Sequence, residues 1–599
     1  MPFGAALRDD GATRFRLWAP GARRVDLALA HDRARAAVPL AAVEGGWFEA
    51  TVPDAPAGAR YAFRVDDGRS VPDPASRCNP DDVHAPSMVV DPRAFDWPDD
   101  GWRGRPWEEA VIYELHVGAF TPAGTFAAAI ARLDDLAALG VTALELMPVA
   151  DFPGRRSWGY DGVLPFAPDA AYGAPDDLKR LVAAAHARGL MILLDVVYNH
   201  FGPEGNYLHL YAPQFFNPAH HTPWGAAINF DGEHARTVRD FFVHNALYWL
   251  EEYRFDGLRL DAVHAIADDS PADIVSEIAR AVRAGPGADR HVHLVLENDR
   301  NDARYLARDA GGRPERATAQ WNDDVHHAAH ILVTGETDGY FADYADRPLW
   351  HFARGLAQGF AYQSEPSPYR GGRPRGAPSA GLPATAFVNF LQTHDQVGNR
   401  AHGERIGALA RPGPLAAVTA CVLLAPTPPM LFMGEEFGAA SPFLFFCDFG
   451  PALAAAVATG RREEFRQFAR FRDPQARESI PDPNDPATFE RSRLDWSERE
   501  REPHRTQLAL YRRLLDVRRR EITPRLAGMR PGGEFECEGA GGLAVRWTLG
   551  DGARLHLAAN LGDAPGRLAA PPGRLVHATE RDAPAAPWSV IATLEAAGG

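Results

Sequence analysis

The sequence predicts an α/β protein built around a (β/α)8 TIM barrel, with an N-terminal β-sandwich domain and a small C-terminal β domain. From about residue 110, almost continuously apolar runs alternate with helical patterns, as in a parallel sheet that is buried on both faces. About eight such runs are present, which favours a closed barrel over an open sheet. Shorter segments that alternate apolar and polar residues occur at both ends of the chain and are typical of antiparallel strands.

The first 92 residues are expected to form the sandwich. Four segments alternate apolar and polar residues and are separated by Gly and Pro: TRFRLWAP, RVDLALA, GWFEATV and ARYAFRVDDG. A proline-rich stretch follows and suits a linker. We expect the sandwich over 1–92, the barrel with its insertions over 93–524 and the C-terminal β domain over 525–599.

Seven barrel strands are clear in the sequence, and an eighth is weaker. The clear ones are VIYELHVGAF, VTALELMPV, MILLDVVYNH, FDGLRLDAV, HLVLEND, FVNFLQTHDQVG and TPPMLFMGEEFG. The weaker sixth strand lies near TAQWNDDVHHAAH. Helices are expected at FAAAIARLDDLAALG, DDLKRLVAAAHARGL, PADIVSEIARAVRAG and PHRTQLALYRRLLDVRRR, and C-terminal strands in FECEGAGGLAVRWTLG and ARLHLAANLG.

Composition excludes several classes of function. The formal net charge of −16 argues against nucleic acid or an anionic membrane surface as a partner, while a neutral ligand stays compatible with it. No apolar run approaches the 18 residues of a membrane span, and the first residues lack the apolar core of a signal peptide. Four scattered cysteines fit a reducing compartment, so we expect a cytoplasmic protein.

Motifs for cofactor and metal chemistry are also missing. Lys179 is the only lysine, which argues against Schiff-base chemistry, and we expect it on the solvated face of its helix. The sequence has no GxxxxGK[ST] phosphate loop, no GxGxxG after a strand and no HExxH. We therefore expect no cofactor and no catalytic metal.

Acidic residues recur at the same end of successive barrel strands. Asp261, Glu297 and Asp395 follow the fourth, fifth and seventh strands, at the carboxyl ends where barrel active sites lie. One such residue could belong to a structural ion pair, but three are difficult to explain in this way. Cleavage of a glycosidic bond needs one carboxylic acid to protonate the leaving oxygen and one carboxylate to attack or to activate water. Retention of configuration would require the two groups to lie about 5–5.5 Å apart.

Four short motifs resemble the conserved regions of the α-amylase superfamily of glycoside hydrolases. They are DVVYNH, GLRLDAVHAI, LEND and THDQ, in this order and on the expected strands. The resemblance implies that Asp261 is the nucleophile, that Glu297 is the general acid/base and that Asp395 stabilises the transition state. Arg259 would favour the charged form of Asp261.

Longer strings resemble one family of that superfamily, the maltooligosyltrehalose trehalohydrolases. They include PDPASRCNPDDVHAPSMVVDP, SWGYDGV, LENDRND, THDQVGNRAHGER and FERSRLDWSE, and they extend over nearly the whole chain. The resemblance implies a carbohydrate-binding-like sandwich, and hydrolysis of the α-1,4 bond next to a terminal α,α-trehalose unit of maltooligosyltrehalose. It also implies a functional pairing with a maltooligosyltrehalose synthase. A glycogen branching enzyme, or another enzyme acting on α-1,4-glucans, is the alternative. A relative that only binds carbohydrate is less favoured, because all three acids are present.

The residues expected to bind substrate come from these motifs and from the segment around the sixth strand. QWNDDVHHAAH is interpreted as a loop that reaches sugar hydroxyls rather than as a metal site, and a structural turn is the alternative for each residue. Tyr160 is expected to stack on a sugar ring, whereas Trp158 could equally fill the core. The expected set is Tyr160, His200, Arg259, His264, Asn322, Asp323, Asp324, His326, His327, His394, Gln396 and Asn399.

A few other positions leave two interpretations open. Asn199 resembles a calcium ligand of some amylases, but the rest of such a site is not identifiable. Glu435, Glu436 and His116 follow strands and are as readily structural as functional. The run 443–446 could be core or a wall of the site, and Asp256 is expected to be structural.

Overall fold

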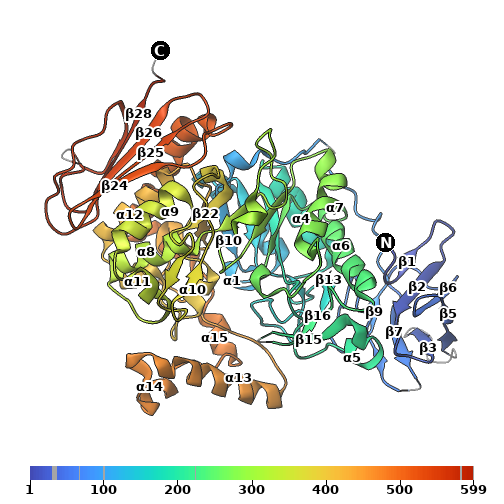
Figure 1. Ribbon diagram of the computed structural model, residues 1–599. Helices are drawn as coiled ribbons and strands as arrows, with labels where there is room; N and C mark the ends of the chain where they lie inside the picture. Colours follow the sequence, from blue (N-terminus) through green and yellow to red (C-terminus); the bar gives the residue numbers. More distant parts are fainter. Residues whose placement is uncertain (30–36, 67, 99–100, 223, 581–582, 598–599) are drawn as a thin grey trace.

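The computed structural model describes residues 1–29, 37–66, 68–98, 101–222, 224–580 and 583–597. Figure 1 shows three parts: a small β domain at the N-terminal end, a large central α/β part, and a C-terminal β sheet on its far side. Within the described ranges, no helix combines the length and the apolar character that crossing a membrane requires.

The N-terminal part consists of two antiparallel sheets. One sheet has the order β1–β2–β6–β5 and the other β4–β3–β7–β8, with β9 paired to β7. Their bounds are β1 Ala6–Leu7, β2 Thr13–Trp18, β3 Val25–Leu29, β4 Val38–Pro39, β5 Ala41–Val43, β6 Trp47–Val52, β7 Arg60–Val65, β8 Ser70–Val71 and β9 Ser87–Met88. The four strands expected here are confirmed; Ala30 and Asp67, at the ends of two predicted segments, lie outside the described residues.

Eight parallel strands close into a barrel in the centre of the molecule. In order around the barrel they are β10 (Ile112–Leu115), β11 (Ala143–Leu146), β14 (Met191–Val196), β17 (Gly257–Leu260), β18 (His293–Leu296), β19 (Ala319–Trp321), β22 (Phe387–Phe390) and β23 (Pro429–Phe432). Each corresponds to one predicted strand, including the weak sixth. The prediction of a (β/α)8 barrel is therefore confirmed.

The barrel interior is layered. Side chains of a strand point alternately to its two faces, so residues two apart share the interior. One interior layer is apolar and comprises Ile112, Ala143, Leu193, Val295, Ala319, Val388 and Met430. Two residues further along four strands, the same face carries Glu114, Glu145, Asp195 and Glu297, and Arg259 follows Gly257 in the same way. The charged layer thus lies nearer the carboxyl ends of the strands, above an apolar floor.

Helices surround the barrel, with one departure from the expected pattern. The main ones are α4 (Pro175–His186), α6 (Ala235–Glu251), α7 (Ile274–Ala284), α8 (Asp323–Thr334), α9 (Pro348–Gln358), α12 (Pro412–Leu424) and α16 (His504–Val517). The single helix predicted over 126–140 is two, α2 (Phe126–Ile130) and α3 (Leu133–Leu139). The break arises because the N–H groups of Ala131 and Arg132 donate to carbonyls three residues back instead of four.

Lys179 does not lie on a solvated face, so that expectation was wrong. Its side chain in α4 is completely buried. Its ammonium group lies 3.5 Å from a carboxylate oxygen of Glu252 and 5.2 Å from the ring centre of Tyr253. The charge is tolerated because the segment just after α6 supplies both a counter-charge and an aromatic face.

The segment around the sixth strand is also not a loop. After β19, Asn322 is the residue before helix α8, and Asp323 and Asp324 occupy its first turn. Acidic side chains are favoured there because the helix dipole leaves partial positive charge at the N-terminus. The buried residues Val325, Ala328 and Ala329 then continue an apolar face at helical spacing.

The C-terminal part is a five-stranded antiparallel sheet of order β24–β25–β26–β28–β27. Its strands are β24 (Glu534–Glu538), β25 (Gly542–Thr548), β26 (Arg554–Asn560), β27 (Arg574–Ala578) and β28 (Ser589–Glu595). It contacts α9 and α12 of the barrel. The predicted β character of this part is confirmed.

Asp256 connects several segments at the amino-terminal end of the barrel, opposite the charged layer. Its fully buried carboxylate accepts hydrogen bonds from Trp102 Nε1 (2.7 Å) and from the N–H of Ile192 (2.9 Å). His186 Nε2 lies 3.0 Å and Arg290 NH1 3.4 Å from the same carboxylate. One side chain therefore links the segment before β10, the end of α4, the start of β14 and the segment before β18.

Replacing Asp256 by alanine should destabilise the protein by about 3–5 kcal/mol, because the buried Ile192 N–H and His186 ring lose their acceptor and Arg290 loses its counter-charge. Asp289→Asn at an exposed position is the matched control and should change the free energy of unfolding by less than about 0.5 kcal/mol. Denaturant unfolding of both variants measures the difference. Equal stabilities would show that the Asp256 network does not hold this end of the barrel.

Candidate active site

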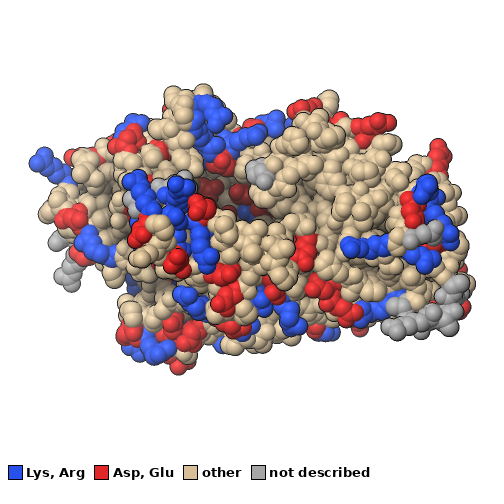
Figure 2. Space-filling model, turned by 90° about the horizontal axis from the view of Figure 1, so that it is seen from below, with Lys and Arg blue, Asp and Glu red and all other residues tan. Residues whose placement is uncertain are grey.

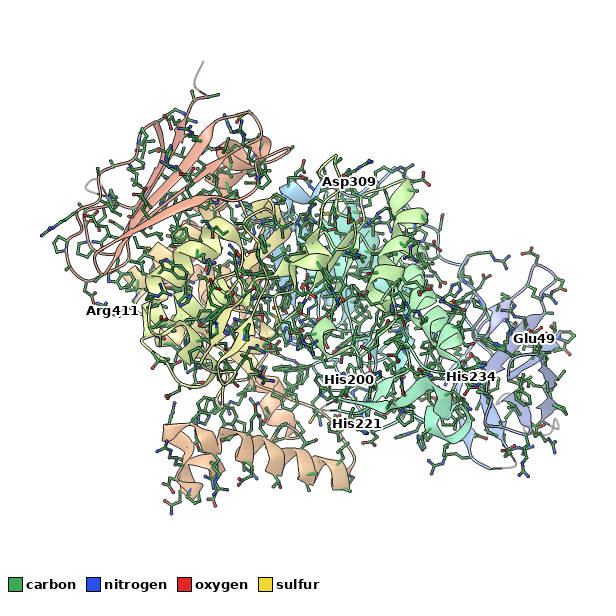
Figure 3. All side chains as sticks on the ribbon, in the orientation of Figure 1. Glu49, His200, His221, His234, Asp309 and Arg411 are labelled. Atoms are coloured by element: carbon green, nitrogen blue, oxygen red, sulfur yellow. The ribbon has the colours of Figure 1, made fainter. Side chains whose placement is uncertain are left out.

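The charged layer opens into a cavity at the carboxyl ends of the strands. Seen from below in Figure 2, the molecule has a central hollow with acidic side chains in its depth. Figure 3 places His200, which follows β14, on this lower side, whereas Asp309, in the segment before β19, lies on the upper side. The cavity has a volume of about 340 Å³ and is lined by His264, Glu297, Asp299, Asp323, His327, Tyr340, Asp343, Tyr344, Tyr369, Arg370, Arg375, Asp395, Gln396 and Asn399.

Arg259 is the central cation of the site. Its guanidinium is buried in the barrel, and one nitrogen, NH1, donates to Asp195 Oδ2 (2.7 Å) and to Asp261 Oδ1 (2.9 Å). The other, NH2, donates to Glu297 Oε2 (3.2 Å). The central carbon of the group, Cζ, lies 4.2 Å from the ring centre of Trp321. One guanidinium thus holds carboxylates from three successive strands at defined positions.

Asp261 follows directly after β17 and is held by two donors. Arg259 bonds its Oδ1, and Asn199 Nδ2 donates to its Oδ2 (2.7 Å) and to its backbone carbonyl (2.9 Å). Ala262, the next residue, has φ 41°, a left-handed conformation that costs energy for a residue with a Cβ. This turn directs the Ala262 N–H to Glu297 Oε2 at 2.7 Å. The strained turn therefore links the positions of the two carboxyl groups.

Glu297 has the electrostatic character of an acid. Burial raises its pKa well above the usual value, and the neighbouring charges of Asp261 and Asp395 raise it further, while Arg259 opposes them. Both donors described above bind Oε2, so Oε1 is the oxygen left for a proton or a ligand. A carboxyl group that stays protonated near neutral pH can donate that proton to a leaving oxygen.

Asp395 and His394 begin the short helix α10 (His394–Gly398) after β22. The hydroxyl of Thr393 caps this helix by accepting from the Asp395 N–H at 3.2 Å. Asp395 lines the cavity, where Asn399 Nδ2 donates to its Oδ1 (3.2 Å) and His394 Nε2 lies 3.4 Å from the same oxygen. A third carboxyl group is thus brought to the cavity that Glu297 lines.

Tyr160 and His200 close the other side of Arg259. The Tyr160 hydroxyl donates to Asp195 Oδ2 (2.6 Å), and its ring stacks on His394 with centres 5.2 Å apart. The His200 ring bonds through Nδ1 to Asn199 Oδ1 and through Nε2 to the Tyr160 carbonyl at 3.0 Å. It also stacks on Trp224 with centres 4.6 Å apart. These polar groups are engaged with the protein and hold the wall of the site.

Of the five candidates around the sixth strand, the structure brings two to the cavity. Asp323 and His327 line it, and Gln396 Nε2 donates to Asp323 Oδ1 at 3.1 Å. Burial and then the charge of Asp299 raise the pKa of Asp323 to about 7, with Asp395 and Asp324 adding to the effect.

The other three candidates of this segment are turned into the protein. Asn322 Nδ2 donates to the Gly359 carbonyl and to Asn389 Oδ1. His326 Nδ1 donates to the carbonyl of Leu391 at 2.5 Å. Asp324 pairs with Arg375 NH1 at 2.7 Å and accepts from Tyr344 and from two backbone N–H groups. The helical rotation of α8 explains the division, because Asp323 and His327 are four residues apart and share one face.

Several cavity residues were not expected from the sequence. The hairpin of β20 (Glu365–Ser367) and β21 (Arg373–Arg375) contributes Arg370, which binds both oxygens of Asp299 at 2.5 Å. The same hairpin supplies Tyr369, and the 3-10 segment η6 (Gly339–Tyr344) supplies Tyr340, Asp343 and Tyr344. The sequence signal for this hairpin is a tyrosine beside arginines in the Gly- and Pro-rich segment SPYRGGRPRG.

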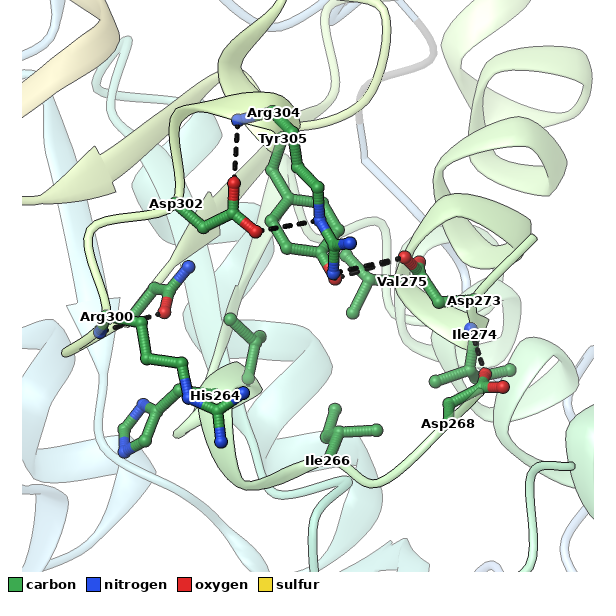
Figure 4. A pocket seen from close by; sticks show the side chains of 12 residues that line it. His264, Ile266, Asp268, Asp273, Ile274, Val275, Arg300, Asp302, Arg304 and Tyr305 are labelled. Carbon is green, nitrogen blue, oxygen red and sulfur yellow. Dashed lines mark hydrogen bonds and ion pairs between the residues drawn. The ribbon is translucent and has the colours of Figure 1, made fainter. Parts of the chain in front are cut away.

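His264 lies between this cavity and a second, smaller one of about 50 Å³. Its Nδ1 accepts the N–H of Asp299 at 3.2 Å. Figure 4 shows the smaller cavity, where Asp302 binds the Arg304 guanidinium at 2.8 Å and Tyr305 donates to Asp273 at 3.1 Å. Its acidic groups are therefore already paired with neighbouring side chains.

The positions with two open interpretations mostly belong to the core. Trp158 is buried, donates to the Leu444 carbonyl and stacks on Phe443. Glu435 accepts from Tyr511, and Glu436 accepts from Tyr113, all in the interior. His116 caps the short helix α1 (Val117–Phe120), and Phe443, Leu444 and Phe446 are buried.

Three family models match the chain. Residues 2–87 match the carbohydrate-binding module 48, described as the isoamylase N-terminal domain, and residues 90–246 match the alpha amylase catalytic domain. Residues 531–592 match a domain of unknown function, DUF3459. The first two models match the sandwich and the first part of the barrel.

Curated relatives and a solved structure match most of the chain. A malto-oligosyltrehalose trehalohydrolase of Arthrobacter ramosus is 46% identical over 84% of this chain and 87% of its own. Another, from Rhizobium sp. (strain M-11), is 44% identical over 88% of each chain. A crystal structure described as a putative alpha amylase from Salmonella typhimurium is 46% identical, with a TM-score of 0.94 over 99% of each chain. The chain is therefore a glycoside hydrolase and belongs to the malto-oligosyltrehalose trehalohydrolase family of the α-amylase superfamily.

Proposed function

We propose that this enzyme hydrolyses the α-1,4 bond next to the terminal α,α-trehalose unit of maltooligosyltrehalose and releases trehalose with retention of configuration. The observation that carries the proposal is the arrangement of Asp261 and Glu297 on one buried arginine at the mouth of the barrel. Similarity to trehalohydrolases over most of the chain supports the choice of substrate.

The first step assigned to the site forms a glycosyl ester. Asp261 attacks the anomeric carbon of the sugar on the non-trehalose side, while Glu297 gives its proton to the glycosidic oxygen. The carbon–oxygen bond breaks, and trehalose leaves with that proton. Asp395 lines the same cavity as Glu297, and its carboxylate stabilises the positive charge that develops on the sugar ring.

The second step restores the enzyme. Glu297, now a carboxylate, removes a proton from water, and the water oxygen attacks the anomeric carbon. The ester bond to Asp261 breaks, which leaves a shorter maltooligosaccharide with the α configuration. The two donors on Glu297 Oε2 stabilise the carboxylate between the two steps.

The polar cavity suits the trehalose half of the substrate. Tyr340 and Tyr369 offer aromatic rings, while Asp323, Gln396 and Asn399 offer groups that bond hydroxyls. In this proposal Tyr160, His200, His264 and His394 line the reacting sugar. Asn322, Asp324 and His326 have partners within the protein, so we assign them a supporting role.

The proposal extends to the roles of the three domains, the cellular compartment and the source of the substrate. The sandwich of 1–92 would contact the oligosaccharide, the barrel of 93–524 would cleave it and the sheet of 525–599 would buttress the barrel. The scattered cysteines support work in the cytoplasm, and a maltooligosyltrehalose synthase would supply the substrate.

Incubation with maltooligosyltrehalose tests the function. Free trehalose should appear, and folded Asp261→Ala and Glu297→Gln proteins should release none, because each lacks a group that makes or breaks a bond. Chromatography of the products against trehalose measures this. If an α-glucan gains branches and no trehalose appears, the chain is a branching enzyme and the proposal is wrong.

Neighbouring aspartates in α8 provide a matched pair. Above pH 7, where the Asp323 carboxyl is ionised, Asp323→Asn should lower kcat/KM by about 10–100-fold with little change in stability, because a charged hydrogen bond to substrate contributes about 1.5–3 kcal/mol. Asp324→Asn should instead lower the unfolding temperature, because it weakens the buried pair with Arg375. Steady-state kinetics and thermal unfolding of both variants separate the roles. The reverse pattern would contradict the placement of these side chains.

A further inference from the structure

We propose that Glu114, on the first barrel strand, is a positioning residue: it holds the His394 ring as a double donor and aims Nε2–H into the active site. The idea rests on the proposed function, because it concerns how the same site works. It adds a residue to which the sequence motifs gave no role.

The contacts of Glu114 and His394 are mutual and buried. His394 Nδ1 lies 2.5 Å from Glu114 Oε1, and the backbone N–H of His394 donates to Glu114 Oε2 at 3.0 Å. The side chain of His394 is 1% exposed and that of Glu114 is 2% exposed. Both carboxylate oxygens are thus used on one residue, which fixes the position and the rotation of the imidazole.

The partners of the second ring nitrogen determine the protonation state. Tyr160 donates its hydroxyl proton to Asp195, so its oxygen accepts from His394 Nε2, 2.9 Å away. Asp395 Oδ1, at 3.4 Å, is likewise an acceptor. With acceptors at both nitrogens, the ring must donate twice, and only the imidazolium does so.

The charges around His394 agree with this assignment. The groups that face it are Glu114 on β10, Glu145 on β11, Tyr160 in the loop before β13 (Leu164–Pro168), Arg259 on β17, His116 after β10 and Asp395 beside it. Burial alone would lower the pKa of His394, but Asp395 and Glu114 outweigh burial and Arg259 and raise it to about 9. The cation therefore persists over the neutral range.

The function of this cation follows from its place. It lies beside Asp395, which lines the cavity, and stacks on Tyr160, so its Nε2 faces the polar groups that wall the active site. A rigid donor there keeps the reacting sugar aligned and compensates part of the negative charge of the site. Glu114 does not reach the cavity and acts only through His394.

Glu145 offers a matched control. It is the register partner of Glu114 on β11, and it is equally buried. Within the described chain, neither of its carboxylate oxygens has a hydrogen-bond partner, and burial raises its pKa well above the usual value, with Glu114 adding to the effect. Glu145→Gln therefore breaks no hydrogen bond within the described chain, and it keeps the shape of the side chain.

The test compares Glu114→Gln with Glu145→Gln. Glu114→Gln should lower kcat about 10–100-fold, the range seen when carboxylates that orient metal-bound histidines are removed, with a smaller change in KM. Glu145→Gln should stay within about 2-fold of the wild type. Because the imidazolium is the active form, activity is lost as pH rises through its pKa, and Glu114→Gln should move the alkaline limb of kcat/KM to lower pH. Glu114→Asp, which keeps the charge, should retain most of the wild-type pH profile.

A double-mutant cycle shows whether Glu114 acts through His394. His394→Asn keeps a donor at the position of Nδ1 but removes Nε2–H. In that background, Glu114→Gln should cost no further activity. Equal losses with and without His394, or a Glu145→Gln loss as large as that of Glu114→Gln, would overturn the proposal.

If Glu114→Gln does not fold, the same cycle with Glu114→Asp decides the question, since its smaller loss must also vanish in the His394→Asn background. If wild-type enzyme releases no trehalose, the proposed function fails, but the cycle can still be measured on any α-1,4-glucan that the wild type cleaves.

Discussion

The active site depends on one buried cation, Arg259. Its guanidinium is completely enclosed, yet it binds Asp195, Asp261 and Glu297 from three successive strands. Burying this charge without partners would cost several kcal/mol, so the arginine and its carboxylates are mutually required. The fork geometry of arginine lets one residue set the spacing of two carboxyl groups with different tasks, which a lysine could not do in the same way. Asn199 and the N–H of Ala262 add further hydrogen bonds to the same carboxyl groups.

The barrel and its charged ends could be predicted because both follow from local pattern. Continuous apolar runs identified the strands, and the motif on the fourth strand identified Arg259 and Asp261 as site residues. What could not be predicted was side-chain direction beyond the strands. Asp323 and Asp324 are adjacent in sequence, and only the rotation of α8 turns one to the cavity and the other to Arg375. Lys179 was misplaced for a related reason, since a distant segment supplies its partner.

Glu114 illustrates a second kind of information that a sequence lacks. It occurs in an apolar strand with no motif around it, and its partner His394 is 280 positions away. Only closure of the barrel brings β10 beside the residues that follow β22 and β23. The distinction between Glu114, which is bonded, and Glu145, which is not, likewise depends on that long-range pairing. Charged residues on neighbouring strands therefore acquire opposite roles from their surroundings alone.

The assignment of Asp261 as the group that forms a covalent bond is the central claim about mechanism, and trapping the intermediate tests it most directly. A fluorinated glucosyl fluoride that forms the ester quickly and hydrolyses it slowly should label the enzyme. After proteolysis, mass spectrometry should locate the added sugar on the peptide that contains Asp261. Labelling of the peptide that carries Glu297 or Asp395, with Asp261 unmodified, would contradict the account.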